Sequence, residues 1–363
     1  MVKVCHIIIA CFLSALNTIA QSTKDSIVAR FKSSDNYLFS SDSPLSIKIK
    51  GNTRDLLNDR TGEPKYFPMS LFVKNADSVE ISIPVNIKTR GHFRRLKQNC
   101  HYPPLLIQFS SADSKATSVF TSKAKLKLVM PCNGDDYVVQ EWLVYKMYNL
   151  VTPESFKTRL VKVTLENEKN GKSTGPFFGI IIEEEKDMAR RNGAVIINRK
   201  TKPHKTASDV FLKMAVFEYL IGNTDWSVEY LQNIKLIAAD STSVPHTVPY
   251  DFDHAGIVSA PYALPAEELQ LNSVRDRRYR GYCVNDFNKF ETVVTHFNSL
   301  KNDIYNLYTD CPLLDSRYVK STIKYLDEFY KTINNPEELK KEFGYPCDKN
   351  GTGNVIIRGL KED

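Results

Sequence analysis

The chain has 363 residues, of which 42% are hydrophobic, and this composition is typical of a globular protein large enough for two lobes of one enzyme-like unit. It excludes an intrinsically disordered chain. The net charge of +7 is spread along the sequence, so it favours an anionic ligand only weakly, and no dense basic patch of the nucleic-acid-binding kind is present.

The first twenty residues have the pattern of a secretory signal peptide. Lys3 supplies the positive start, residues 4–16 form the apolar segment, and Thr18-Ile19-Ala20 is a small-residue cleavage site. We therefore expect cleavage after Ala20 and an exported protein, either secreted or held in the periplasm or cell envelope. A short N-terminal anchor and a lipid-modified Cys11 are the alternatives, although the apolar run is short for a membrane span. No later stretch is apolar enough to cross a membrane, so no stable membrane span is expected.

Seven cysteines are present, and two of them lie within the predicted signal peptide. Export places the other five in an oxidising compartment, where disulfides form. We predict one disulfide between Cys100 and Cys132, because both flank strand-like segments of the first half. A second pair, Cys283 with Cys311, is also expected. No Cys-x-x-Cys pair or Cys/His cluster indicates a zinc site.

The pattern of apolar residues divides the mature chain into two main parts. Residues 21–42 are predicted to form a polar leader, 43–185 a β-rich N-lobe, 186–335 a mainly helical C-lobe and 336–363 a C-terminal tail. In the N-lobe, strands are predicted at 46–50, 70–73, 85–90, 105–109, 123–129, 159–167 and 176–184, and a helix at 136–150. In the C-lobe, helices are predicted at 206–221, 286–308 and 315–333, and strands at 234–239 and 246–250. The acidic run at 183–185 marks the boundary and is interpreted as a solvated helix start.

Several residues of the N-lobe are candidates for binding a nucleotide cofactor. Gly91 follows Arg90 at the end of a predicted strand, and a glycine there could bring the backbone close to a phosphate group. Lys125 and Lys127 lie on one face of their strand, and Glu141 lies on the helix that follows. A strand lysine paired with a helix glutamate is one way to orient nucleotide phosphates, and the spacing permits that pair. A solvated basic turn and a solvated strand face are the alternatives, and both interpretations stay open.

The most informative stretch follows the strongest predicted helix. That helix ends at Gly222, and Asp225 lies in the loop directly after it. Asn233 then precedes a strand, and Asp251 follows the next one. A carboxylate can take a proton from a hydroxyl group, and an amide together with a carboxylate can hold Mg²⁺ on a nucleotide. Asp225 is therefore a candidate catalytic residue, and Asn233, Asp251 and Asp253 are candidate metal ligands.

Each of these residues also has an ordinary interpretation. Asp225 is the kind of residue that commonly caps a helix or forms a turn. The run Tyr250-Asp251-Phe252-Asp253 is also compatible with a strand-end turn or a structural cation site. It is the order of the three polar residues, with strands between them, that favours a site for phosphate transfer.

This stretch resembles the spore-coat protein H (CotH) kinase family in Gly222-Asn223-Thr224-Asp225-Trp226, in Asn233 and in Pro249-Tyr250-Asp251-Phe252-Asp253. The resemblance is firm over 215–256 and extends more loosely over 85–260. It implies a two-lobed atypical protein-kinase-like fold of the α+β class and ATP-dependent phosphorylation of protein serine or threonine hydroxyls, with Mg²⁺ or Mn²⁺. By motif position it implies that Asp225 is the catalytic-loop aspartate, Asp251 the first metal ligand and Asn233 the second.

The sequence departs from the protein-kinase pattern at two places. Asn233 follows Asp225 by eight residues, whereas the protein-kinase catalytic loop has a shorter spacing, and no Gly-x-Gly-x-x-Gly loop is present. We predict an exported kinase with ATP between the two lobes, an unidentified protein substrate and no nucleic-acid partner. The alternative is a catalytically inactive scaffold of the same family that acts as an envelope or surface interaction module.

Overall fold

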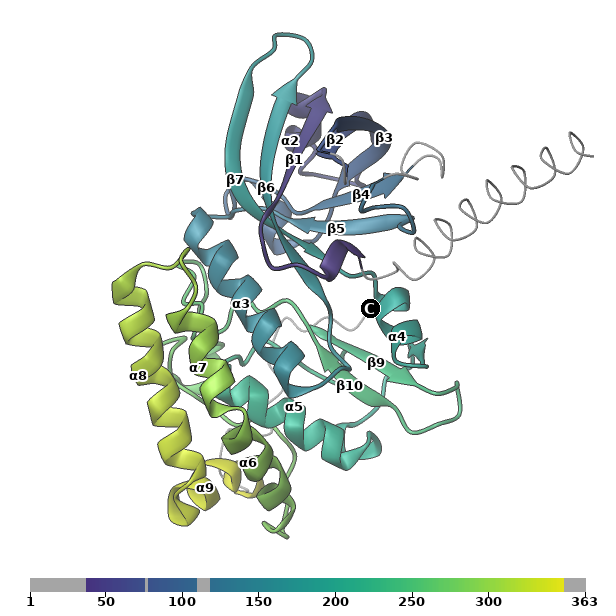
Figure 1. Ribbon diagram of the computed structural model, residues 1–363. Coiled ribbons are helices and arrows are strands. Elements are labelled where there is room, and N and C mark those ends of the chain that lie inside the picture. Colours follow the sequence, from purple (N-terminus) through teal and green to yellow (C-terminus); the bar gives the residue numbers. More distant parts are fainter. Residues whose placement is uncertain (1–36, 76–77, 110–117, 349–363) are drawn as a thin grey trace, which may run out of the picture.

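A computed structural model describes residues 37–75, 78–109 and 118–348 of the chain (Figure 1). The predicted signal peptide, most of the predicted leader and residues 349–363 lie outside this part. Within it the protein combines helices with two sheets, a seven-stranded barrel and a three-stranded sheet, as a mixed α and β prediction requires. No helix among the described residues has both the length and the apolar character that a membrane span needs.

The barrel is built by the N-terminal half in the strand order β1-β2-β3-β4-β5-β7-β6. Its strands are β1 (Leu45–Gly51), β2 (Phe67–Lys74), β3 (Glu80–Thr89), β4 (Leu105–Phe109), β5 (Lys125–Val129), β6 (Thr158–Asn167) and β7 (Ser173–Ile182). Every strand predicted for this half is confirmed, with shifts at the ends. The barrel closes where β1 runs parallel to β6, with Ile47 opposite Val163. Alternate side chains point inward and form a separate apolar core around Ile49, Leu71 and Leu128.

Helices form most of the C-terminal half and surround a second core. The helices of the described chain are α2 (Thr53–Asn58), α3 (Asp135–Val151), α4 (Glu185–Arg191), α5 (Ser208–Ile221), α6 (Lys289–Ser299), α7 (Lys301–Thr309), α8 (Ser316–Ile333) and α9 (Pro336–Phe343). The small sheet has the order β10-β9-β8 and consists of β8 (Val195–Ile197), β9 (Ile234–Ala238) and β10 (His246–Pro249). Figure 1 shows the barrel at one end of the molecule and α5 to α9 at the other.

The single helix predicted at 286–308 is wrong, because the structure divides it into α6 and α7 at Leu300. Neither glycine nor proline marks this break. The Ser299 hydroxyl donates a hydrogen bond to the carbonyl oxygen of His296 at 2.7 Å, and such side-chain bonds compete with the helical backbone pattern. The only local signal is therefore a serine, which is too weak to predict a break from the sequence.

Helix α3 joins the two cores. It follows β5 in the chain, contacts β6 and β7 of the barrel, and contacts α7 of the helical half. Its side chains from Val138 to Tyr145 are all buried. A helix that is buried on every side lies inside the protein rather than on its surface. Glu141, at its centre, is consequently an interior carboxylate.

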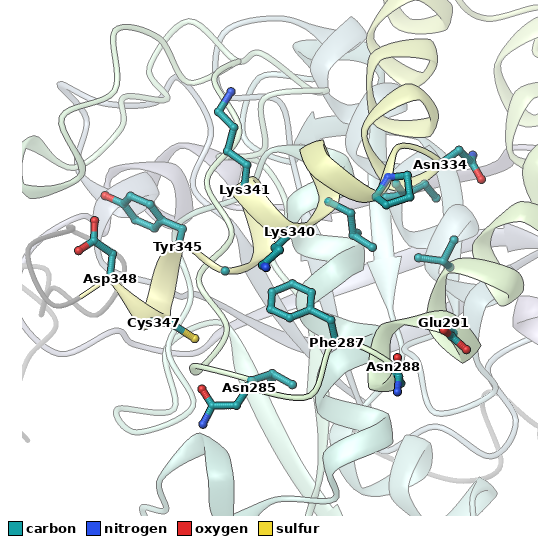
Figure 2. A pocket seen from close by; sticks show the side chains of 16 residues that line it. Asn285, Phe287, Asn288, Glu291, Asn334, Lys340, Lys341, Tyr345, Cys347 and Asp348 are labelled. Atoms are coloured by element: carbon teal, nitrogen blue, oxygen red, sulfur yellow. The ribbon is translucent and has the colours of Figure 1, made fainter.

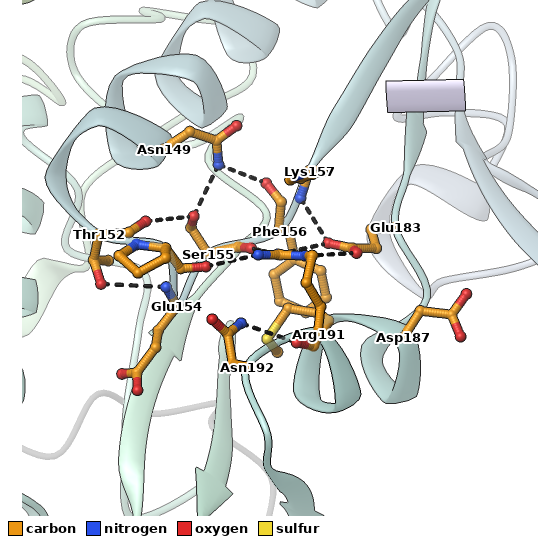
Figure 3. A network of polar contacts seen from close by, with 12 residues as sticks. Asn149, Thr152, Glu154, Ser155, Phe156, Lys157, Glu183, Asp187, Arg191 and Asn192 are labelled. Carbon is orange, nitrogen blue, oxygen red and sulfur yellow. Dashed lines mark hydrogen bonds and ion pairs between the residues drawn. The ribbon is translucent and has the colours of Figure 1, made fainter. Parts of the chain in front are cut away.

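A polar network fixes the end of β7 against the chain that leads from α3 to β6 (Figure 3). The Arg191 guanidinium on α4 forms an ion pair with the Glu183 carboxylate at 3.0 Å. It also donates hydrogen bonds to the carbonyl oxygens of Pro153 and Ser155. Glu183 accepts a further bond from the Lys157 backbone N–H at 3.0 Å. Because Glu183 is 2% exposed, its prediction as a solvated residue is wrong, and its buried ion pair holds α4 in place.

Two disulfides are present among the described residues. The predicted bond between Cys100 and Cys132 is confirmed. The predicted pair of Cys283 with Cys311 is wrong, because Cys283 is bonded to Cys347 and Cys311 is a free thiol. Disulfide pairing depends on which cysteines folding brings within bonding distance, and sequence spacing does not reveal it.

The second disulfide depends on a helix that the sequence did not predict. Residues 336–348 had been assigned to a tail, but they form α9 and a short turn, and Phe343 is fully buried in the helical core. This packing brings Cys347 to the loop before α6.

Candidate functional site

Asp225 lies in a loop that begins at the end of α5. Gly222 ends the helix with a φ of 68°, a left-handed conformation that glycine adopts without strain. The side-chain oxygen of buried Asn223 accepts a hydrogen bond from the Asp225 backbone N–H at 3.1 Å. The Asn223 carbonyl oxygen accepts another from the Trp226 indole at 3.2 Å. The loop is therefore fixed to a rigid helix, which suits a residue that positions a reacting group.

A tight turn brings Asn233 back to Asp225. Ser227 and Gln232 pair through two backbone hydrogen bonds of 2.9 Å, so the residues between them form a closed loop. The Asn233 side-chain amide then donates to the Asp225 backbone carbonyl at 2.8 Å and to the Asp225 carboxylate at 3.0 Å. This loop accounts for the long spacing in the sequence and brings two of the predicted site residues into direct contact.

Asp251 lies at the same end of the β9–β10 hairpin as Asn233. Pro249 pairs with Ile234 at this end, and the Asp251 backbone N–H donates a hydrogen bond to the Tyr145 hydroxyl on α3 at 2.9 Å. Asp251 has a φ of 65°, a left-handed conformation that is unusual for a side-chain-bearing residue and costs about 1–3 kcal/mol. Its carboxylate has no hydrogen bond or ion pair within the described part of the chain.

The pKa of the Asp251 carboxyl is raised, first by burial and then by the charge of Asp253. The positive charges of Arg90 and Arg94 oppose this shift, and the charge of Asp225 adds to it. These interactions place all five side chains in one electrostatic neighbourhood. The candidate residues Arg90, Asp225, Asp251 and Asp253 are thus brought together from separate parts of the chain.

A second group of charges, called here the buried clamp, consists of Arg94, Glu141, Asp253 and Tyr262. The Arg94 guanidinium lies 3.6 Å from the Glu141 carboxylate and 3.5 Å from the Asp253 carboxylate. It also donates a hydrogen bond to the Met130 carbonyl oxygen at 2.6 Å. The Tyr262 hydroxyl donates to Asp253 at 2.9 Å. Asp253 therefore already has an ion pair and a hydrogen bond, which distinguishes it from Asp251.

Burial governs the protonation of the clamp. It raises the pKa of Glu141, and the charge of Asp253 raises it further, while the charge of Arg94 opposes both. Burial alone would lower the pKa of Arg94, but Tyr262 and the charges of Asp253 and Glu141 together raise it above the ordinary value. Arg94 therefore stays charged.

The predicted ion pair between Glu141 and a strand lysine is wrong, because the partner of Glu141 is Arg94. Arg94 enters from the short helical turn η2 (Phe93–Arg95) after β3, and the sequence showed it only as part of a basic run. Lys127 lies beside Glu185 instead, with Nζ 4.0 Å from the carboxylate. Lys125 is exposed at the start of β5.

Lys127 belongs to a third group, called here the lysine cluster, with Arg90, Lys235 and Glu185. The Lys235 ammonium group lies 2.9 Å from the Glu185 carboxylate. Both lysines lie near the face of the Tyr250 ring, at 5.7 Å for Lys127 and 5.6 Å for Lys235 from Nζ to the ring centre. Burial lowers the pKa of Lys127, and the nearby charge of Arg90 lowers it further. Lys235 and Glu185 were missed in the sequence, since a lysine in a short strand and an acid at a helix start are both common.

Arg280 is a further residue that the sequence did not single out. It is buried beside the Asp225 loop and donates hydrogen bonds to the carbonyl oxygens of Thr224 and Trp226. Burial lowers its pKa to about 10, and the charge of Asp225 opposes that shift. Arg280 thus remains positive at neutral pH and places a cation beside the Asp225 loop.

The residues at the end of the β9–β10 hairpin fit a divalent cation bound to a nucleotide. The Asp251 carboxylate has no partner, and the Asn233 side-chain oxygen accepts no hydrogen bond from the described residues. Carboxylate and amide oxygens are suitable ligands for Mg²⁺, and substrate phosphates supply further ligands. No group of three or more His, Cys, Asp or Glu side chains suited to holding a metal ion by itself occurs within residues 37–75, 78–109 and 118–348.

A separate recess of about 1000 Å³ lies beside the Cys283–Cys347 disulfide (Figure 2). Its walls come from the loop before α6, from α9 and from the turn that follows, and they include Phe287, Lys340 and Tyr345. None of the candidate catalytic, metal or phosphate-binding residues lines it. The candidate residues therefore lie at the β9–β10 end rather than in this recess.

Comparison with known proteins gives little beyond this geometry. No protein-family model matches the sequence, and no curated protein matches it. Among solved structures, the chain is similar to a proinflammatory kinase of Helicobacter pylori, CtkA. The identity is 12%, the match covers 63% of this chain and 88% of that chain, and the TM-score is 0.37. At this TM-score, the likeness does not decide the activity of the present chain.

Proposed function

We propose that this protein is an exported kinase of atypical, two-lobed architecture that transfers phosphate from ATP to serine or threonine hydroxyls of proteins. The supporting observation is the direct hydrogen bonding of Asn233 to Asp225, with the unpartnered Asp251 carboxylate at the same hairpin end. Phosphoryl transfer needs few covalent steps from the protein and depends on positioning and charge stabilisation. This set of residues suits such a reaction.

In this proposal each group has one task. Asp225 orients the acceptor hydroxyl and accepts its proton, and Arg280 holds the Asp225 loop through the carbonyl oxygens of Thr224 and Trp226. Asp251 and Asn233 hold the metal, and Lys127 and nearby cations bind phosphate oxygens. Bound ATP with Mg²⁺ or Mn²⁺ supplies the phosphoryl group and neutralises the charge that develops during transfer.

The two disulfides support the proposal that the protein is exported. Two disulfides fit an oxidising compartment, where such bonds persist. The predicted signal peptide, outside the described residues, belongs to the same proposal. Sequencing the N-terminus of the protein recovered from an export-competent host tests it, with Gln21 expected as the first residue.

Nucleotide binding is the first test of the kinase proposal. ATP with Mg²⁺ or Mn²⁺ should raise the melting temperature of residues 21–363, because a ligand that binds only the folded state stabilises it by about 2.7 kcal/mol at one hundred times its Kd. Asp251→Ala should remove this shift and leave the melting temperature without ligand nearly unchanged. A native protein with no shift under any nucleotide would refute the proposal and favour the interaction module.

Transfer is the second test and separates an active enzyme from an inactive scaffold. Asp225→Ala should bind ATP as the native protein does but transfer labelled phosphate to a mixture of exported proteins about 10²–10⁴-fold more slowly, as expected when a general base is lost. Binding without transfer by the native protein would identify the catalytically inactive alternative.

A further inference from the structure

One carboxylate oxygen joins two lysines that come from different sheets. Oε2 of Glu185 lies 2.9 Å from Nζ of Lys235 on β9 and 4.0 Å from Nζ of Lys127 on β5. Both ammonium groups are thus drawn toward a single point where the barrel meets the small sheet. The three side chains are 19–26% exposed, so the point is partly shielded and remains open to a solute.

The surroundings of this point carry more positive than negative charge. Arg90 is close enough to lower the pKa of Lys127 and of Asp251, and its guanidinium has no hydrogen bond or ion pair within the described residues. Neither lysine has another ion-pair partner in that part of the chain. Glu185 is therefore the one carboxylate within ion-pair distance of Lys127 and Lys235 there, and it balances a single charge.

We propose that Arg90, Lys127 and Lys235 form one polyphosphate site, and that Glu185 occupies it as an internal counter-ion until a ligand displaces the carboxylate. The inference deepens the proposed function, on which it rests for the nature of the ligand. It adds two residues, Lys235 and Glu185, and assigns Glu185 the role of a carboxylate that every anionic ligand of the site must displace.

Displacement of Glu185 lowers the affinity of the site for any anion. A ligand that enters must break the Lys235–Glu185 ion pair, and it gains only the difference between its own interactions and those of the carboxylate. A single phosphate group can replace Glu185 at the lysines but reaches few further donors. A chain of phosphates carries more charge and can contact cations from β5, β9 and the loop after β3 together. The carboxylate therefore lowers the affinity for every anion by the same displacement cost, and the contacts with further cations give a chain of phosphates the higher affinity.

The test measures anion binding by calorimetry without divalent cations, with inorganic tripolyphosphate and inorganic phosphate as probes. Glu185→Gln should bind tripolyphosphate about three- to tenfold more tightly than the native protein, as expected for the removal of one competing ion pair. Its gain for inorganic phosphate should be of similar size, because both probes displace the same ion pair. Lys235→Met should weaken tripolyphosphate binding by at least tenfold.

Glu166→Gln is the matched control. Glu166 forms a 2.6 Å ion pair with Lys50 on the barrel surface, away from the lysine cluster, so this variant loses a comparable ion pair and should bind both probes as the native protein does. Equal or weaker tripolyphosphate binding by Glu185→Gln would overturn the proposal. An equal gain in Glu166→Gln would also overturn it, because the effect would then come from net charge alone.

The outcome is separable from that of the kinase proposal. If Glu185→Gln tightens tripolyphosphate binding but the native protein transfers no phosphate, the site stands and the kinase activity does not. If the native protein transfers phosphate but Glu185→Gln leaves the affinity for tripolyphosphate unchanged, the kinase stands and the counter-ion role of Glu185 does not.

Discussion

The buried clamp and the lysine cluster lie in one electrostatic neighbourhood, but they differ in how completely their charges are paired. In the clamp, Arg94, Glu141 and Asp253 are 9%, 1% and 5% exposed, and the single cation faces two carboxylates. In the lysine cluster the side chains are partly exposed, and the single carboxylate contacts two of the three cations, Lys127 and Lys235.

The difference separates a structural element from a ligand site. A buried ion pair is costly to break, because the partner left behind is an unpaired charge in a medium of low dielectric. A partly exposed excess of cations costs less to maintain and leaves donors free for an incoming anion. The clamp therefore ties η2, α3 and the loop after β10 together, whereas the lysine cluster remains open to a solute.

The largest effect is expected from breaking the clamp. Arg94→Met leaves Glu141 and Asp253 buried without their cation and should lower the free energy of unfolding by about 3–5 kcal/mol. Urea denaturation measures this loss. Lys50→Met, which removes an exposed ion pair with Glu166, should cost much less than Arg94→Met, because exposed ion pairs contribute little to stability. A loss below that of the control would show that the clamp is not a stability element.

Replacing all the charged side chains of the clamp by apolar ones tests whether unpaired charge causes this loss of stability. Arg94→Met combined with Glu141→Met and Asp253→Leu removes all three charges together, and replacing a whole buried ionic group is often nearly neutral. We expect this triple variant to be more stable than Arg94→Met alone. If it is less stable, packing rather than unpaired charge explains the loss.

An intermediate effect is expected from the lysine cluster, and it concerns binding. Lys127→Met should leave the unfolding free energy without ligand unchanged or slightly raised, because burial already disfavours the charged form of Lys127. It should reduce the stabilisation by ATP with Mg²⁺ to below about 1 kcal/mol at a concentration that gives the native protein about 2.7 kcal/mol. Thermal denaturation with and without nucleotide measures both quantities.

Lys125→Met is the matched control for this substitution. Lys125 lies on the same strand, two residues earlier, and is exposed. Its removal should change neither stability nor nucleotide binding. Equal effects of the two substitutions would mean that the placement of Lys127 beside Glu185 has no bearing on the ligand.

The sequence was sufficient for elements whose signal is local. Alternation of apolar residues predicted the barrel strands, and Gly222 marked the end of α5 because a left-handed cap favours glycine. It did not predict that the sheet closes, because closure depends on pairing between β1 and β6, which lie more than a hundred residues apart. The second disulfide was missed for the same reason, since the packing of α9 decides it.

The candidate site likewise contains residues that local sequence signals revealed and residues that only tertiary packing brings together. Asp225, Asn233 and Asp251 were found because each follows or precedes a predicted element, and their polar chemistry is visible in the sequence. The partner of Glu141 was not, because an arginine from a turn and a lysine from a strand give equivalent patterns until α3 is placed. Glu185 was assigned to a solvated helix start, and only the position of β9 brings Lys235 to it.

The smallest effect is expected in the pH dependence of stability, where the contributions of Glu141 and Glu185 should differ. The folded-state pKa of Glu141 is raised, so the stability it contributes is complete below the unfolded value near 4.5 and is lost as the pH rises through the folded value. Burial alone would raise the pKa of Glu185, but Lys235 and Lys127 lower it. Its contribution is therefore present above the unfolded value and is lost only as the pH falls through the folded value.

Urea denaturation between pH 5 and pH 8 distinguishes the two carboxylates. The stability of the native protein relative to Glu141→Gln should decline across this range, by at most about 1.4 kcal/mol per pH unit for one titrating group. The stability relative to Glu185→Gln should stay constant, because Glu185 is ionised throughout in both states. A constant difference for Glu141→Gln would mean that Arg94 outweighs burial, and a declining one for Glu185→Gln would mean that its carboxylate is not held by the lysines. Either result would mean that Glu141 and Glu185 do not differ in the direction of their pKa shifts, and the clamp and the lysine cluster would then not be distinguished by them.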